Sequence, residues 1–249
     1  MESPVAWLIG ASSGIGAELA RRLAEAGWQV ALTARRAERL EALCQASPSQ
    51  LYSFPGDVTD PEGLSALAAR IEAELGPVEL CILNAGDYEP MGLDDFDVNL
   101  FRRLMEVNYL GVVHGLAAVM PAMRARGRGQ ILITASLAGY RGLPRAAPYG
   151  ATKAALISLA ESLQPELAAE GVRLRVINPG FVKTPLTDKN RFEMPFLMTT
   201  EQAAEAIMKG LHKDAFEIRF PWRFALMMGL LRLLPNGLYL RIARRMVSA

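Results

Sequence analysis

Between residues 10 and 16 the chain reads Gly10-Ala11-Ser12-Ser13-Gly14-Ile15-Gly16. This stretch follows the short apolar run Val5–Ile9 and precedes an amphipathic run with Leu19, Leu23 and Ala26 on one face, which Gly27 should end. Glycines let a backbone turn tightly and approach a ligand, and a following helix directs its free N–H groups at a phosphate. Alone, such a sequence is compatible with a plain tight turn. Between a strand and a helix, it predicts a nucleotide-binding site.

Short apolar runs alternate with longer amphipathic runs along the chain. Six of them predict strands: Val5–Ile9, Trp28–Thr33, Gln50–Phe54, Val78–Leu83, Gln130–Ala135 and Val172–Asn178. Strands separated by helices predict an α/β fold, a Rossmann-type doubly wound parallel sheet in three layers, α/β/α. We find no repeat or linker, and 51% hydrophobic content suffices for one core, so we expect a single domain over residues 1–249.

Composition excludes several other classes of protein. The net charge is +1 without a long run of one sign, which gives no electrostatic reason to expect a nucleic-acid partner. Cys44 and Cys81 fall in regular elements, and we expect both to be reduced. His114 and His212 lack the spacing of a metal site, so no metal is expected. Because Met1–Pro4 leaves no room for the basic segment of a signal peptide, we expect a cytoplasmic protein.

The second predicted strand ends in Thr33-Ala34-Arg35-Arg36, where this fold distinguishes between dinucleotides. An acidic residue there would bind the ribose 2′-hydroxyl of NAD(H), whereas a guanidinium suits the 2′-phosphate of NADP(H). Arg35 therefore favours NADP(H). Alternatively, Arg35 and Arg36 form a solvated helix start, although cations at a helix N-terminus oppose its dipole.

Tyr149 and Lys153 open a long helical run that continues through Ala169. Their i, i+4 spacing places both side chains on one helix face. An ammonium beside a phenol favours the phenolate and should bring the pKa of Tyr149 into a useful range, so that Lys153 tunes and Tyr149 acts as acid or base. On the spacing alone, a Tyr/Lys pair on the surface of a helix is the commoner explanation.

Together, these and several further motifs resemble those of the short-chain dehydrogenase/reductase family. The glycine turn fits its glycine motif, Asp57-Val58 its adenine-contacting pair and Asn84-Ala85-Gly86 its NAG signature. The residues that fit its catalytic tetrad are Asn108, Ser136, Tyr149 and Lys153. Pro179-Gly180 with Thr184 fits the loop against the nicotinamide, so the resemblance spans Gly10 to Thr184.

The resemblance implies a role for each member of the tetrad. Ser136 would hydrogen-bond the substrate oxygen, and Tyr149 would protonate that oxygen as a hydride arrives from C4 of the nicotinamide. Lys153 would lower the pKa of Tyr149 and hold the ribose hydroxyls. Asn108, within the helical run Asn99–Val119, would hold a water through its backbone carbonyl as part of a proton path from Lys153.

With Arg35, the resemblance gives a set of expected cofactor contacts. They are Gly10, Ser12, Ser13, Gly14, Ile15, Gly16, Arg35, Asp57, Val58, Asn84, Ala85, Gly86, Tyr149, Lys153, Pro179, Gly180, Val182 and Thr184. The chain departs from the family at Ile9, usually threonine, and at Leu83, usually a second asparagine. We expect these departures to cost some loop rigidity and to remove no group that does chemistry.

Residues after Pro179-Gly180 correspond to the mobile substrate lid of the family, here about 181–211. The segment Phe181–Met198 is apolar and rich in methionine, which suits an apolar carbonyl substrate, although packing of a loop on the core explains it equally well. A capping-box pattern starts at Thr199.

The C-terminal tail, about 218–249, combines apolar bulk with arginines. Its apolar run is too short to span a bilayer and is interrupted by Pro235. The charged side chains after Glu217 are all arginines: Arg219, Arg223, Arg232, Arg241, Arg244 and Arg245. This composition suits an interfacial helix on an anionic membrane, and it also suits a helix that covers the substrate pocket or a partner subunit.

The helix from Tyr149 carries small residues that allow close helix approach: Ala151, Ala154, Ala155, Ser158 and Ser162. The resemblance implies that this helix pairs with its copy, so we expect a homodimer or homotetramer. The sequence thus predicts an NADP-dependent oxidoreductase acting on a carbonyl or alcohol carbon of a small molecule. Two alternatives stay open: a non-catalytic NADPH-binding protein, and a membrane-surface protein that uses the tail as its anchor.

Overall fold

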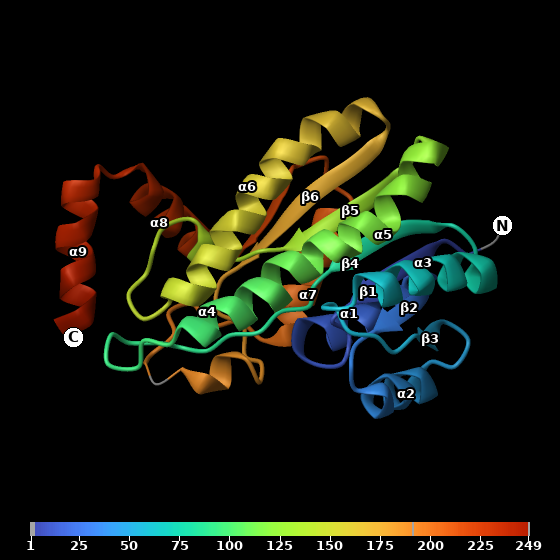
Figure 1. Ribbon diagram of the computed structural model, residues 1–249, viewed down its shortest axis with the longest axis horizontal. Helices are drawn as coiled ribbons and strands as arrows, with labels where there is room; N and C mark the ends of the chain where they lie inside the picture. Colours follow the sequence, from blue (N-terminus) through green and yellow to red (C-terminus); the bar gives the residue numbers. More distant parts are fainter. Residues whose placement is uncertain (1–2, 191, 249) are drawn as a thin grey trace.

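The computed structural model describes residues 3–190 and 192–248. Met1 and Glu2, Arg191 of the expected lid and Ala249 of the expected tail lie outside the described residues. Seven parallel strands form one sheet in the order β3-β2-β1-β4-β5-β6-β7 (Figure 1). The strands are β1 (Val5–Ile9), β2 (Gln29–Thr33), β3 (Leu51–Ser53), β4 (Val78–Leu83), β5 (Gly129–Thr134), β6 (Val172–Pro179) and β7 (Glu217–Phe220). The predicted doubly wound α/β fold is confirmed.

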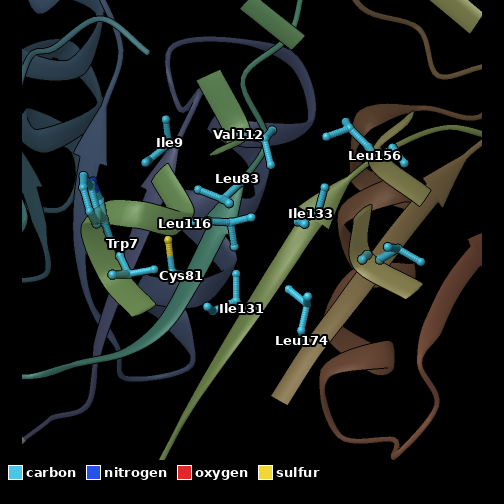
Figure 2. Close-up of a cluster of buried hydrophobic side chains, with 14 of the residues drawn as sticks. Trp7, Ile9, Cys81, Leu83, Val112, Leu116, Ile131, Ile133, Leu156 and Leu174 are labelled. Atoms are coloured by element: carbon cyan, nitrogen blue, oxygen red, sulfur yellow. The ribbon is translucent and has the colours of Figure 1, made fainter. Parts of the chain in front are cut away.

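Helices cover both faces of this sheet. The helices are α1 (Gly14–Glu25), α2 (Ala37–Ala46), α3 (Pro61–Leu75), α4 (Val98–Met105), α5 (Gly111–Arg126), α6 (Ala147–Ala169), α7 (Thr200–Leu211), α8 (Trp222–Leu233) and α9 (Asn236–Ser248). On one face, α3, α5, α6 and the inner side of α8 pack against the strands. Figure 2 shows part of this core, where Leu116 of α5 lies near Cys81 and Leu83 of β4. On the other face, α1, α2 and α7 cover a second core.

The six predicted strands agree with the structure to within one residue at either end, and a seventh was missed. Strand β7, Glu217–Phe220, pairs with β6 at the edge of the sheet. This strand was missed because four residues beside the tail are too few to show a clear alternation of apolar and polar side chains.

Helix α1 ends where expected, since Gly27 has a φ of 86°. Ala26, however, is exposed and caps the helix instead of packing with Leu19 and Leu23.

The helical run expected over Asn99–Val119 is longer and is interrupted. Between α4 and α5, the backbone forms a π-helical turn, η1 (Glu106–Leu110), which contains Asn108. By length and apolar composition, the continuous segment Val98–Arg126 could cross a membrane. In the described structure it instead lies on the sheet, with Val112 and Leu116 in the core.

The two departures from the family pattern form part of this core. Ile9 and Leu83 are register partners in β1 and β4, and both are buried. A Cβ on Gly115 of α5 would lie 2.5 Å from the Leu83 Cδ2 atom and 3.6 Å from the Ile9 Cδ1 atom. The structure therefore assigns these apolar side chains to close packing of α5 on the sheet.

Candidate active site

The glycine turn sits at the point where the strand order reverses, between β1 and β4. A Cβ on Gly10 would lie 2.5 Å from the backbone nitrogen of Ala85, and one on Gly16 would overlap the Gly10 carbonyl oxygen. The Asn84 side chain donates to that same carbonyl at 3.1 Å. The loops after β1 and β4 thus lie against each other, and only glycine fits at these contacts.

The N-terminus of α1 is open to a ligand. Its N-cap residue, Ser13, makes no side-chain capping hydrogen bond, so the first N–H groups of the helix remain available to an anion. Thr184 lies across from Gly14, where a Cβ would meet the Thr184 Cγ2 atom at 3.0 Å. The loop after β6 therefore closes over the start of α1.

A cavity of about 640 Å³ runs along this edge of the sheet. All the expected cofactor contacts line it except Gly16, which instead shapes the turn. Asp57 accepts a hydrogen bond from the Thr59 backbone at 3.0 Å, and the Val58 carbonyl lies 2.8 Å from Nδ1 of His114. These contacts hold the loop after β3 in place at one end of the cavity.

Two exposed arginines lie at the end of β2, where one was predicted to act. Arg35 and Arg36 both line the cavity. Arg36 donates to the Ser12 hydroxyl at 3.0 Å and to the Ser13 hydroxyl at 3.5 Å. Only Arg35 was predicted from the sequence, and this contact of Arg36 was missed. The adjacent pair Arg35-Arg36, after the strand that follows the glycine turn, was the available signal.

The tetrad residues Ser136, Tyr149 and Lys153 converge where β5 ends and α6 begins. Ser136 is buried, and its hydroxyl donates to the Pro179 carbonyl at 3.3 Å. The Lys153 ammonium is also buried, donates to the Thr134 carbonyl at 2.8 Å and lies 5.6 Å from the centre of the Tyr149 ring. All three line the cofactor-sized cavity, so the structure brings them together as predicted.

Burial controls the protonation of this pair more strongly than their proximity does. Loss of solvent raises the pKa of Tyr149 to about 12, a shift that a hydrogen bond with Ser136 opposes and that Tyr88 reinforces. Burial also lowers the pKa of Lys153 to about 8. The expected lowering of the Tyr149 pKa is therefore wrong, because desolvation of a phenolate is costly. At neutral pH, the phenol carries its proton.

Asn108, the fourth residue of the tetrad, does not line the cofactor-sized cavity. Its side chain is fully buried, accepts from the Asp87 backbone nitrogen at 2.7 Å, and donates to the Asp87 carbonyl at 2.9 Å and to the Thr152 hydroxyl at 3.1 Å. Asn108 therefore ties the loop after β4 to the residue next to Lys153. The proposed water on its backbone carbonyl stays a prediction.

A second cavity, of about 810 Å³, meets the first at Ser136 and Tyr149. Its walls include Phe181 and Phe192 from the lid and Phe224 from α8. The ring centres of Phe181 and Phe192 are 5.7 Å apart, and those of Phe181 and Phe224 are 5.4 Å apart. The tail thus helps to form this apolar wall through Phe224, which agrees with the alternative that a helix of the tail covers the substrate pocket.

Tyr88 is a wall residue that the sequence analysis missed. Its ring packs edge-on against Tyr149 with the centres 5.0 Å apart, and its hydroxyl donates to the Asn190 side chain of the lid at 2.7 Å. Lys189 of the lid donates to the Tyr88 carbonyl at 2.6 Å and to Glu89 at 3.1 Å. An aromatic residue two positions after the NAG motif was the available signal. The lid is fastened over the second cavity by these contacts.

No group of three metal-ligating His, Cys, Asp or Glu side chains occurs within residues 3–190 and 192–248. The side chains that gather at the tetrad are a hydroxyl, a phenol and an amine. What this arrangement can do is move a proton to or from an oxygen held between two cavities.

The chain belongs to the short-chain dehydrogenase family, whose sequence model matches residues 4–194. It is similar to an uncharacterized oxidoreductase of Myxococcus xanthus, with 38% identity over 99% of this chain and 98% of that protein. Among solved structures, it is similar to a short chain dehydrogenase from Burkholderia cenocepacia in complex with NADP, with a TM-score of 0.84 and 29% identity over 96% of this chain and 97% of that one. It is also similar to an alcohol dehydrogenase from the archaeon Thermococcus sibiricus complexed with 5-hydroxy-NADP, with a TM-score of 0.79 and 29% identity over 88% of this chain and 96% of that one.

Proposed function

We propose that the protein is an NADPH-dependent oxidoreductase that reduces the carbonyl group of an apolar small molecule, with Tyr149 as the proton donor. The observation that carries the proposal is the position of Ser136 and Tyr149, which line both cavities. A substrate oxygen at this junction would meet a hydroxyl and a phenol at once. The presence of every tetrad residue favours catalysis over the non-catalytic alternative.

A dinucleotide fits the first cavity on structural grounds. A Cβ on Gly10 or Gly16 would overlap backbone atoms of the two loops that line the cavity. The N-terminus of α1 is available to a phosphate, and a Cβ on Gly86 would lie 3.6 Å from the Lys153 ammonium. When bound, nicotinamide supplies the hydride. We assign the phosphates to the turn and to α1, and the ribose near Lys153.

The chain's own residues supply the proton chemistry. The Ser136 hydroxyl would orient the substrate oxygen, and the protonated Tyr149 phenol would donate to it as negative charge develops. The Lys153 ammonium, close to the Tyr149 ring, would stabilise the phenolate that remains. Asn108 would keep Lys153 in place through Thr152. The buried setting strengthens each of these interactions, because few waters compete.

Arg35 and Arg36 support the choice of NADPH. Both guanidinium groups line the cavity at the end of β2, and Arg36 reaches the serines of the glycine turn. A 2′-phosphate there would gain charge-assisted hydrogen bonds that a 2′-hydroxyl could not. The NADP and 5-hydroxy-NADP named for the two similar solved structures agree with this choice.

A screen of NADPH oxidation tests the proposal. The purified chain is mixed with aldehydes, ketones, 3-oxoacyl thioesters, quinones and steroids, and the loss of NADPH absorbance is followed. We expect turnover with an apolar member, and a Tyr149→Phe variant should lose about 10²–10⁴-fold in kcat, the usual contribution of general acid catalysis. Tyr52→Phe, which removes a hydroxyl bonded only to a surface turn, is the matched control. Full activity of Tyr149→Phe would overturn the proposal.

A further inference from the structure

Helix α8 has two apolar faces, although it lies at the surface. Phe224, Ala225 and Met228 are buried and point toward the core and the second cavity. On the opposite side, Trp222 is 68% exposed and Leu233 is 80% exposed. A helix at the surface of a soluble domain usually turns polar side chains to the solvent. The outer face of α8 therefore calls for an apolar contact outside this chain.

The exposed stripe on α8 follows from helical spacing. Trp222, Leu226, Leu230 and Leu233 recur every three or four residues, so they lie along one side of the helix. All four are exposed. Met227 and Arg223 flank the stripe, and the Arg223 guanidinium lies 5.4 Å from the Trp222 ring. An arginine beside a tryptophan at the edge of an apolar stripe matches the water–lipid boundary, where amphipathic rings and long basic side chains are stable.

Helix α9 extends this surface and adds positive charge. Tyr239 is buried, donates to the Gly142 carbonyl and lies beneath the Arg141 guanidinium, so it fastens the helix to the loop before α6. Leu238, Leu240, Met246 and Val247 remain exposed on either side of this attachment. Figure 1 shows α8 and α9 together at the end of the molecule away from α2 and β3.

The charge of the two helices decides between the possible binding partners of this surface. The two helices contain five arginines and no acidic residue: Arg223, Arg232, Arg241, Arg244 and Arg245. A second copy docked on the same surface would bring two arginine sets together without a carboxylate from either pair of helices. An anionic bilayer offers both an apolar phase for the leucines and negative headgroups for the arginines.

From this arrangement we propose that the outer faces of α8 and α9 dock on an anionic phospholipid membrane. Apolar side chains enter the interface, and Arg223, Arg241 and Arg245 lie at headgroup level. Because Phe224 lines the second cavity from the same helix, docking brings the cavity wall within one helix thickness of the lipid. This inference goes beyond the proposed reaction, and it stands or falls by membrane binding alone.

Vesicle co-sedimentation of the full chain tests the docking. Vesicles of phosphatidylcholine, with and without about one third phosphatidylserine, are pelleted with the protein. We expect binding only to the anionic vesicles, weakened by salt. Leu226→Gln/Leu230→Gln/Leu233→Gln should abolish it. Arg223→Gln/Arg241→Gln/Arg245→Gln should weaken it on the order of 100-fold, since each arginine near such a surface contributes about fivefold.

Matched variants control for general effects of composition and charge. Arg39→Gln/Arg128→Gln/Lys209→Gln makes the same change of net charge at exposed positions outside the tail and should bind like the wild type. Thermal melting checks that each variant is folded. The proposal is overturned if the wild type stays in the supernatant with anionic vesicles, or if the leucine variant still pellets. If the wild type does not bind vesicles and sedimentation velocity shows that only the leucine variant has lost a dimer, the surface is instead a contact between two copies of the chain.

Discussion

Folding changes the pKa of Lys153. Its ammonium is buried and donates to one carbonyl, that of Thr134, at 2.8 Å. Burial lowers its pKa from 10.5 to about 8. Below pH 8, Lys153 is charged in both the folded and the unfolded chain, and burial of the charged ammonium destabilises the folded chain. Between about pH 8 and 10.5, the unfolded chain binds more protons than the folded one, so this group makes stability rise with pH.

Comparison with Lys153→Met isolates that effect. Other titrations cancel in the difference between the two proteins. From pH 8 to pH 10, the free energy of unfolding of the wild type should gain about 2 kcal/mol relative to the variant. Above pH 10, the raised pKa of Tyr149 makes the stability of both proteins fall with pH, because the folded chain then holds the extra proton, and this effect cancels in the difference. Urea unfolding at several pH values measures the free energy of unfolding of both proteins. If the two free energies change with pH in parallel, the pKa of Lys153 is not lowered in the folded chain.

Arg35 alone was expected to bind the 2′-phosphate, but Arg36 lies beside it and donates to the Ser12 hydroxyl of the glycine turn. Arg36→Gln should weaken NADPH binding about 10-fold, the loss of one charge-assisted hydrogen bond, and leave NADH binding unchanged. Arg35→Gln should do the same if both guanidinium groups meet the 2′-phosphate. Fluorescence titration with each dinucleotide measures both, and Arg39→Gln on α2 is the control. An equal loss for NADPH and NADH would contradict the assignment.

Among the elements, α8 connects the tail to the second cavity. Phe224 is buried, with its ring centre 5.4 Å from that of Phe181. Phe224→Ala should cost about 3 kcal/mol of stability through the cavity it leaves, and should raise the KM for apolar carbonyls. Phe96→Ala, at an exposed aromatic before α4, should change stability by less than about 0.5 kcal/mol. An unchanged KM in Phe224→Ala would remove α8 from the substrate site.

Elements with strong local patterns were predictable from the sequence. The central strands are continuous apolar runs between turn residues, and the capping box at Thr199 and Gln202 forms as its spacing predicted. The glycine turn was found from its place between a strand and a helix, and the tetrad, including Asn108 in η1, was found from its resemblance to the motifs of the family. Local sequence sufficed for the strands, the capping box and the glycine turn, because each one has a recognisable pattern within a few consecutive residues.

Features that depend on distant partners were not predictable. The π-helical turn at Asn108 is held by hydrogen bonds to Asp87 and Thr152, far away in the sequence. Strand β7 forms only because β6 offers its edge. Tyr88 becomes part of the site through the edge-on contact with Tyr149. The raised pKa of Tyr149 likewise follows from burial, which the i, i+4 spacing does not show.

For the whole molecule, a face of α6 bears on the expected self-association. Ala151, Ala154, Ser158 and Ser162 are all exposed on this helix. We propose that this face pairs with its copy in a dimer, where small side chains allow the helices to approach closely. Ser158→Glu should then convert dimers to monomers in sedimentation velocity, because two copies would bring like charges together. Ser65→Glu, at an exposed serine of α3, should leave the dimer intact; a dimer of Ser158→Glu would place the interface elsewhere.

In the proposed reaction, Tyr149 donates a proton to the carbonyl oxygen of the substrate while the carbon bonded to that oxygen receives a hydride from NADPH. NADPH carrying deuterium at both hydrogen positions of C4 is mixed with the active carbonyl compound and excess enzyme in a single turnover. The wild type should place the label on the product carbon as the NADPH absorbance falls. Tyr149→Phe should still bind NADPH and should transfer the label at least about 100-fold more slowly. Label transfer at the wild-type rate by Tyr149→Phe, or a product without label, would contradict the account.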